Sequence, residues 1–410
     1  MRDSATQSYI GLDIGTSAVR CVVGMVDPNN PGTLSIVGHG SAPNLGMRKG
    51  VVVHIEDAAE AIAGAITEAE RLCGIRINGA TVNINGTHVT GINSKGVIAI
   101  SAANREITQE DRMRVEEAAT IVKLPPNREI IQVFAKNYRL DGQENIKDPV
   151  GMHGVRLEVD THIVTVAMPS LRNLDMALEK AQVTPHNHTL SSLAAAEAVM
   201  ERHQKEAGTV LLDIGAGTTN LVVLEDGEVQ HVAVLPIGGS HITNDLAIGL
   251  KTDLEVAEAV KIKYAALHTE APNREVRVKL EDQEHLFSSE EINMITEARV
   301  EELLEYADKE LARIHRARKL PGGVVLVGGT AKMPGIAALA KEKLQLAARV
   351  GKLHGVSGLI DTVADPAFAT ATGLMMLDML LLPEVNTSHG GQTSARALKV
   401  VDNLWRKFKQ

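Results

Sequence analysis

Two stretches of the chain, far apart in the sequence, share one arrangement of a carboxylate and a turn of small residues. Residues 9–24 read YIGLDIGTSAVRCVVG and residues 209–224 read TVLLDIGAGTTNLVVL, so Asp13 matches Asp213. In each stretch a β-rich run meets the carboxylate and a glycine turn, and a second β-rich run follows. Each stretch is therefore predicted to form a β-hairpin, and we name them the first hairpin and the second hairpin.

The turns of both hairpins carry residues that suit phosphate groups. Glycine lets backbone N–H groups converge on an anion without a Cβ in the way, and the hydroxyls beside it add donors. The carboxylates would repel phosphate, but each could hold Mg2+ through the water shell of the ion. Two such hairpins facing across a cleft would clamp one nucleotide. The predicted phosphate-binding residues are Gly15, Thr16, Ser17, Gly215, Ala216, Gly217, Thr218, Thr219 and Asn220, with Asp13 and Asp213 as the Mg2+-binding pair.

Other phosphate-binding patterns do not fit these stretches. The sequence contains no G-x-x-x-x-G-K-[ST], which excludes a P-loop. The Gly-Ala-Gly of the second hairpin runs into a strand-like stretch where a dinucleotide-binding fingerprint needs a helix. A single turn of this kind is more often an ordinary tight hairpin, but the matched pair favours a nucleotide site.

A third stretch, residues 323–335, reads GVVLVGGTAKMPG. A continuous apolar strand, a pair of glycines and a helix start together allow a flat adenosine to approach the backbone closely. Alone, this stretch would predict only a loop between a strand and a helix. With the two hairpins it completes a nucleotide site, to which it adds Gly328, Gly329, Thr330, Lys332 and Met333.

With these three stretches the chain resembles the actin-like ATPase superfamily, which includes actin, heat-shock chaperone ATPases and sugar kinases. The hairpins resemble its two phosphate motifs, and VLVGGTAKMPG resembles its adenosine motif. Residues 83–98 (NINGTHVTGINSKGVI), with Gly50-Val51-Val52 before them and NIKDPVGMHGVR at 145–156 after them, resemble the FtsA family of bacterial cell-division proteins. This second resemblance covers essentially residues 8–410.

The resemblance implies an α/β protein with the actin-like, ribonuclease H-like two-domain fold, an inserted α+β subdomain called 1C and a C-terminal amphipathic helix. The implied boundaries are 1–81 and 163–207 for subdomain 1A, 82–162 for 1C, 208–244 for the first part of 2A, 245–320 for 2B, 321–382 for the rest of 2A and the return to 1A, 383–395 for a flexible linker and 396–410 for the amphipathic helix.

Further contacts follow from the same resemblance. The turn at Gly238 and Gly239 and the helix at 255–264 are expected near the nucleotide, with Glu258 and Lys261 within reach of the ribose or base. A solvated helix face is the alternative for this pair. A long helix at 292–320 carries a one-sided apolar stripe and lies in 2B, which in the family receives the C-terminal peptide of the tubulin-like protein FtsZ. Arg299 falls near the family's binding position, where a guanidinium would suit a peptide rich in carboxylates.

Composition narrows the class of protein. Of 410 residues, 44% are hydrophobic and 23% charged, which indicates a globular chain long enough for two or more domains. The net charge of -9 argues against a nucleic-acid partner. Two cysteines without metal-ligand spacing, and no apolar leader or membrane-spanning run, predict a cytoplasmic protein.

The last fifteen residues, RALKVVDNLWRKFKQ, are basic and amphipathic. They carry a net charge of +4 and the single tryptophan of the chain. Such a helix is suited to lie in an anionic membrane interface, although docking on its own domain or on a partner is the alternative. The predicted membrane-contacting residues are Val401, Leu404, Trp405, Arg406, Lys407 and Phe408.

These observations favour an ATP-binding cytoskeletal adaptor over an enzyme. The adaptor would bind ATP and Mg2+, polymerise with copies of itself on anionic lipids at the division site, tether FtsZ filaments to the cytoplasmic face of the membrane and meet late division membrane proteins. The alternative is a soluble sugar or acetate kinase of the same superfamily, and a pilus-type adaptor would fit the inserted subdomain less well. Because Asn220 is neutral where family members often carry an acid, at most slow hydrolysis is expected, with Asp213 or Thr219 orienting the water.

Overall fold

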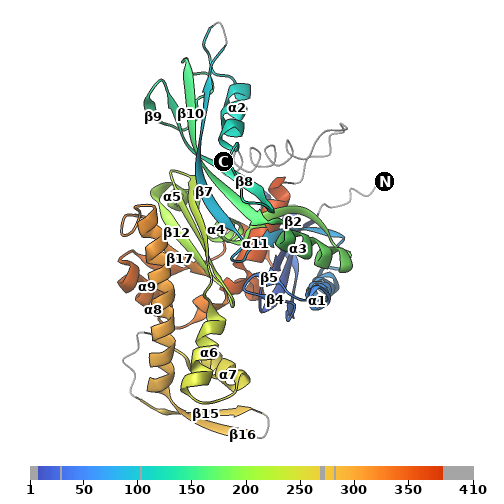
Figure 1. Ribbon diagram of the computed structural model, residues 1–410. Coiled ribbons are helices and arrows are strands. Elements are labelled where there is room, and N and C mark those ends of the chain that lie inside the picture. Colours follow the sequence, from blue (N-terminus) through green and yellow to red (C-terminus); the bar gives the residue numbers. More distant parts are fainter. Residues whose placement is uncertain (1–7, 28–29, 102–103, 268–272, 281–282, 382–410) are drawn as a thin grey trace.

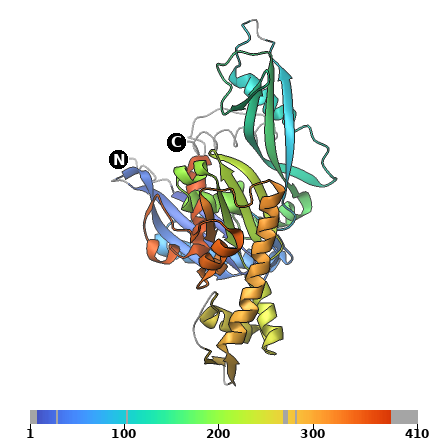
Figure 2. The same cartoon turned by 90° about the vertical axis from the view of Figure 1, so that its left-hand side faces the viewer.

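The computed structural model describes residues 8–27, 30–101, 104–267, 273–280 and 283–381. Two β-sheets with their helices form two halves, which meet at the middle of an elongated molecule (Figure 1). The inserted subdomain lies at one end, and the other end is an extension of the second half that we name the helical extension (residues 239–313), as both views show (Figures 1 and 2).

The first half is a six-stranded sheet with the strand order β11-β6-β1-β2-β3-β19. The first hairpin forms its centre, where β1 (Ser8–Ile14) pairs antiparallel with β2 (Ala18–Asp27) and parallel with β6 (Gly79–Ile84). The other strands are β3 (Asn30–Pro43), β11 (Thr184–Leu190) and β19 (Val356–Gly358), and a short pair β4 (Met47–Arg48) and β5 (Val51–Val52) lies apart. The helices around this half are α1 (Ile55–Cys73), α3 (Met168–Lys180), α4 (Ser191–Val199) and α11 (Ala369–Leu381).

The second half repeats this plan in a five-stranded sheet with the order β14-β13-β12-β17-β18. The second hairpin is β12 (Thr209–Ile214) with β13 (Thr219–Glu225), and β12 also pairs parallel with β17 (Gly323–Val327). Strand β12 is buried throughout and β1 is buried from Tyr9 onward, as expected for central strands whose two faces are both covered. The outer strands are β14 (Glu228–Leu235) and β18 (Ala348–Val350).

The inserted subdomain has a sheet and a core of its own. Its strand order is β7-β10-β8-β9, and α2 packs so closely that a Cβ on Gly96 would lie 2.0 Å from the carbonyl oxygen of Val115. The sequence predicts an N-cap at Thr108 and Asp111, and the structure confirms it, since these two residues form a capping box at the start of α2. The elements are β7 (Thr90–Ala99), α2 (Gln109–Ala119), β8 (Arg128–Leu140), β9 (Gln143–Ile146) and β10 (Arg156–Ala167).

The helical extension of the second half holds the predicted long helix, α8 (Ser289–Arg313). The predicted apolar stripe is confirmed, since Val300, Leu303, Leu304, Ala307 and Leu311 are buried. The predicted end near residue 320 was wrong, because His315 and Arg318 adopt positive φ and turn the chain away. The extension also contains α6 (Gly239–Gly249), α7 (Leu254–Tyr264), β15 (Glu275–Leu280) and β16 (Gln283–Ser288).

The Ala-rich sequence from Ser191 to Glu206 predicts one continuous helix, but this helix is broken in the structure. It forms α4 and the short α5 (Arg202–Ala207), because Met200 has an extended backbone between them. The remaining elements lie between β17 and α11: η1 (Gly329–Lys332), α9 (Ile336–Leu344), α10 (Ile360–Val363) and η2 (Pro366–Phe368).

Helix α11 returns the chain to the first half and is fixed there by a buried carboxylate. Asp378 accepts hydrogen bonds from the backbone N–H of Ile10 (2.9 Å) and the hydroxyl of Thr81 (2.7 Å), and it lies 2.9 Å from Nδ1 of His186. Close packing supports this contact, since a Cβ on Gly11 would lie 2.1 Å from the carbonyl oxygen of Ala371. Helix α11 is therefore joined directly to β1, the strand that leads into the first hairpin.

The predicted linker at 383–395 and amphipathic helix at 396–410, with all six predicted membrane-contacting residues, lie outside the described residues. Among the helices that the structure describes, none is long and apolar enough to cross a membrane.

Candidate functional site

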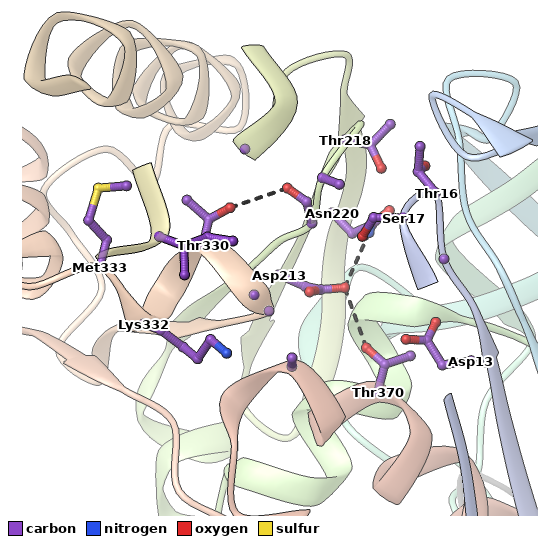
Figure 3. Close-up of a pocket in the computed structure, with 18 of the residues that line it drawn as sticks. Asp13, Thr16, Ser17, Asp213, Thr218, Asn220, Thr330, Lys332, Met333 and Thr370 are labelled. Atoms are coloured by element: carbon purple, nitrogen blue, oxygen red, sulfur yellow. Dashed lines mark hydrogen bonds between the residues drawn. The ribbon is translucent and has the colours of Figure 1, made fainter. Parts of the chain in front are cut away.

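A cavity of about 320 Å³ opens where the two hairpins face each other (Figure 3). Most of its wall comes from the turns of the two hairpins and the glycine loop after β17, and the start of α6, the end of α7 and the start of α11 supply the rest. Of the residues predicted to bind nucleotide, the following line it: Asp13, Gly15, Thr16, Ser17, Asp213, Gly215, Ala216, Thr218, Asn220, Gly239, Glu258, Lys261, Gly328, Gly329, Thr330, Lys332 and Met333.

Three residues predicted for this site, Gly217, Thr219 and Gly238, do not line the cavity. Thr219 is fully buried, and its hydroxyl donates to the carbonyl oxygen of Ile237 at 2.8 Å. Gly217 and Gly238 serve close packing of loops: a Cβ on Gly217 would lie 2.9 Å from Oγ1 of Thr16, and one on Gly238 would lie 2.5 Å from the oxygen of Gly215. These glycines allow the site to assemble because a side chain at either position would push its walls apart.

The two carboxylates face the cavity from opposite halves. Asp13 and Asp213 are each only 8% exposed, and Figure 3 shows both side chains directed toward the space between the hairpins. The pairing register places Arg20 opposite Asp13 and Asn220 opposite Asp213. The first hairpin thus has a cation at the position where the second has a neutral amide.

Side chains from other elements hold these carboxylates. Nδ2 of Asn83, on β6, donates to Oδ1 of Asp13 at 2.7 Å. Oδ2 of Asp213 accepts from Nδ2 of Asn220 at 3.3 Å and from the hydroxyl of Thr370 at 3.4 Å (Figure 3).

Burial raises the pKa of both carboxyl groups above the ordinary value for aspartate. It raises the pKa of Asp13 to about 7, where the negative charge of Asp213 adds to the effect and the positive charge of Arg20 opposes it. Burial also raises the pKa of Asp213, against the hydrogen bonds from Asn220 and Thr370 and the charge of Arg20. Two like charges directed into one cavity are stabilised by a divalent cation.

The residues present fit Mg2+ that arrives with a nucleotide. In the described part of the chain no group of three or more His, Cys, Asp or Glu side chains could hold a metal ion by itself. Two carboxylates beside a phosphate-sized space match the way Mg2+ is usually bound, by one or two carboxylates, waters and substrate phosphates.

The far end of the cavity combines an ion cluster with apolar walls. Nζ of Lys261 donates to Oε2 of Glu258 (2.6 Å), the hydroxyl of Thr243 (2.8 Å) and the carbonyl oxygen of Gly239 (3.2 Å). The predicted pair therefore lines the cavity as part of a network, which suits the hydroxyls of a ribose. Apolar surface for a flat base comes from Ile262, Ala265, Met333 and Pro334.

Several lining residues escaped the sequence reasoning: Arg20, Asn85, Ile262, Ala265, Pro334, Ala367 and Thr370. Arg20 could have been found, since it is a charge inside an apolar strand, placed where a hairpin register would set it beside Asp13. Its guanidinium lies 5.6 Å from the centre of the Phe368 ring. Ala367 and Thr370 reach the site only because the chain returns to it at the start of α11, and no local pattern indicates this return.

Arg299 lies on α8, outside the cavity. Its guanidinium donates to both carboxylate oxygens of Asp245 and to Glu302, and the hydrogen bond that it donates to Asp245 is the main cause that raises the pKa of Arg299. The side chain is 27% exposed. An acidic peptide binding here would therefore have to share or displace Asp245.

Comparison with known proteins finds family matches for the second half of the chain and for the inserted subdomain. The family model described as Cell division protein FtsA matches residues 210–373, and the one described as SHS2 domain inserted in FTSA matches residues 86–165. The FtsA of Pseudomonas aeruginosa is 37% identical over 371 residues, which cover 90% of this chain and 88% of that protein. The FtsA of Bacillus subtilis is 38% identical over 371 residues, with 90% and 82% covered.

Solved structures share the fold at low identity. The PilM-PilN type IV pilus biogenesis complex matches with a TM-score of 0.65 and 19% identity, covering 90% of this chain and 98% of that chain. MreB5 of Spiroplasma citri bound to ADP matches with a TM-score of 0.52 and 14% identity, covering 91% and 97%. The predicted actin-like α/β fold with an inserted subdomain is confirmed.

Proposed function

The chain belongs to the FtsA family of cell division proteins, and from this premise we propose that it is an ATP-binding adaptor that assembles on the membrane and tethers FtsZ filaments. The observation that carries the nucleotide part of the proposal is the cavity between the hairpins, with its paired carboxylates and glycine turns.

ATP would occupy this cavity with its phosphates between the two turns. Asp13 and Asp213 would hold Mg2+ through water, which would neutralise charge on the phosphates. The base would lie against the apolar wall at Ile262 and Met333, with Lys261 near the ribose. A solved structure of the same fold, MreB5 of Spiroplasma citri, is bound to ADP, which is in keeping with this proposal.

Slow hydrolysis fits the same residues. Asn220 cannot accept a proton from water, and its amide instead donates to Asp213. The hydroxyl of Thr219 is bound to Ile237, which leaves Asp213 as the better candidate to orient an attacking water. ATP would then act mainly by stabilising one conformation of the protein while bound, and only slowly as a substrate.

The membrane and FtsZ parts of the proposal rest on the C-terminal sequence and on the family resemblance. The tail combines Trp405 and Phe408 with a net charge of +4, a composition suited to anionic lipid. Fifteen residues bind a membrane reversibly, so self-assembly would supply the avidity needed for stable attachment. The exposed part of Arg299 would meet the carboxylates of the FtsZ peptide. The soluble kinase alternative is not favoured, because the matched relatives are division proteins.

Co-sedimentation with anionic liposomes tests the membrane part. The full chain should pellet more strongly with ATP and Mg2+ than with EDTA, whereas a chain ending at Ala395 should stay in the supernatant. A double variant, Trp405→Glu and Phe408→Glu, should behave like the truncated chain, and neutral liposomes serve as the lipid control. Pelleting by the truncated chain, or by none of the forms, would refute membrane attachment through the tail.

Binding of a synthetic FtsZ C-terminal peptide, followed by fluorescence anisotropy, tests the second part. Arg299→Glu should weaken binding about tenfold or more through lost charge pairing. Arg313→Glu is a matched control on the same helix, because Arg313 is exposed and pairs with Glu310. Equal losses for both variants would indicate a general charge effect and contradict a specific role for Arg299.

A further inference from the structure

Asn83 lies behind the carboxylate of the first hairpin, outside the cavity lining. It is 2% exposed and stands near the end of β6, just past the positions where β6 pairs with β1, which are Gly11 with Thr81 and Leu12 with Val82. The backbone N–H of Ile14 donates to Oδ1 of Asn83 at 2.7 Å. The side chain thus continues the strand pairing at the point where the turn begins.

The hydrogen bonds of Asn83 leave one orientation for its amide. Because the N–H of Ile14 can only donate, the atom facing it must be the amide oxygen, and Nδ2 must point the other way. Nδ2 then donates to Oδ1 of Asp13 at 2.7 Å and to the hydroxyl of Ser191 at 3.0 Å. Both ends of the amide are therefore held, and Asp13 receives a donor in a fixed position.

This contact fixes the Asp13 side chain. With Oδ1 bound to Asn83 at the back, the second carboxylate oxygen is left to face the cavity that Asp13 lines. Among the described residues Asp213 has no comparably short side-chain contact: the donors there are Asn220 and Thr370, which lie at 3.3 and 3.4 Å and reach the same oxygen. The first hairpin presents the more firmly oriented carboxylate.

We propose that Asn83 is a positioning residue for magnesium: it orients the Asp13 carboxylate toward the ion and does not touch the nucleotide. This inference rests on the proposed binding of ATP with Mg2+. Side chains that orient a metal-binding group typically change metal affinity by about 10- to 100-fold when removed. In the sequence Asn83 is only one residue of a family motif, whereas in the structure its three partners lie 69, 70 and 108 residues away along the chain.

The test measures the magnesium advantage, which we define as the ratio of ATP affinity with Mg2+ to ATP affinity with EDTA. Isothermal titration calorimetry on the full chain gives both affinities. For Asn83→Ala we expect the magnesium advantage to fall about tenfold, while the affinity in EDTA stays within about twofold of the wild type. A residue with only a structural role would lower both affinities together.

Thr81→Val is the matched control. Thr81 lies on the same strand, is fully buried, and donates its hydroxyl to Asp378 rather than to Asp13. It should lower the melting temperature and leave the magnesium advantage unchanged. Equal loss of the advantage in Thr81→Val and Asn83→Ala would overturn the proposal.

Ser191→Ala decides the question if Asn83→Ala does not fold. It removes one anchor of the amide and should lower the magnesium advantage about threefold without changing the affinity in EDTA. If Ser191→Ala folds and its magnesium advantage is unchanged, the proposed role of Asn83 is overturned, while the proposed ATP binding is not affected. Failure of the wild type to bind ATP in either buffer would overturn the proposed function itself.

Discussion

The two hairpins have the same sequence pattern and the same register, but their carboxylates have different partners. Asp13 faces Arg20 across its hairpin and is held by Asn83 from β6. Asp213 faces Asn220 and is held by Thr370 from α11. The repeated motif therefore determines where each carboxylate is placed, while neighbours from distant segments determine its charge and orientation.

Replacing each carboxylate by its amide should have the largest effect. Asp13→Asn and Asp213→Asn are each expected to weaken ATP binding in Mg2+ about 100-fold, because each removes a carboxylate proposed to hold the ion. Calorimetry in Mg2+ and in EDTA measures the effect. Asp175→Asn is the control, since Asp175 pairs with His188 away from the cavity. A loss confined to one hairpin would show that only one carboxylate serves the ion.

The pH dependence of stability should separate Asp13 from ordinary carboxylates. Its pKa is about 7 in the folded protein and about 4 in an unfolded chain. The folded state therefore holds this proton between these values and the unfolded state does not, so stability falls as pH rises from about 4 to about 7. Asp213 and Arg20 are the charged groups that act on it.

Asp13→Asn removes this loss. In the absence of Mg2+ and nucleotide, the variant should be more stable than the wild type by about 2 kcal/mol at pH 8, a value that allows for partial screening of the pKa shift of Asp13. At pH 4 the variant should be no more stable than the wild type. Urea denaturation at both pH values measures the difference. A gain of the same size at pH 4 would contradict the assignment to Asp13.

Arg20 gives the first hairpin a cation that the second lacks. Arg20→Ala should weaken ATP binding about tenfold, because it removes a positive charge from the phosphate end of the cavity. Asn220→Ala, at the equivalent register position, should cost about threefold or less. Arg71→Ala on the exposed end of α1 is the charge control. Equal effects at the two register positions would show that the hairpins bind phosphate alike.

Placing an acid at the amide position should have the smallest effect. Asn220→Asp is expected to raise ATP turnover, because a carboxylate can accept a proton from the attacking water. The increase should be only about threefold, since burial and the two neighbouring carboxylates disfavour the ionised form of a third. A coupled phosphate-release assay measures it, and Asn220→Gln is the neutral control. Turnover equal in both variants would mean that Asn220 does not limit hydrolysis.

Local patterns predicted the parts of the site that are continuous in the sequence. The hairpin turns and the glycine loop were readable because a carboxylate, small residues and apolar runs recur within a few positions. The long helix and its buried stripe were readable for the same reason, through their helical spacing. The hairpin turns and the glycine loop together contain most of the residues that line the cavity.

The rest depends on contacts between distant segments, which a single sequence does not contain. Asn83 acquires its position through pairing with β1, and Thr370 reaches Asp213 across 157 residues. Arg299 donates hydrogen bonds to Asp245, which lies 54 residues earlier in the chain. The exposed fraction of the Arg299 side chain therefore could not be predicted from the sequence of its own helix. The extended residue Met200, which divides α4 from α5, is likewise set by packing, since the Ala-rich sequence favours a continuous helix.

The buried carboxylate of Asp378 has a mechanical consequence. It joins the last described helix to the backbone of Ile10, three residues before Asp13 on the same strand. A pull on the chain beyond Leu381 would be carried through this hydrogen bond into β1, rather than being borne by side-chain packing alone. Tension on the end of the chain would therefore load the same strand that carries Asp13 to the cavity.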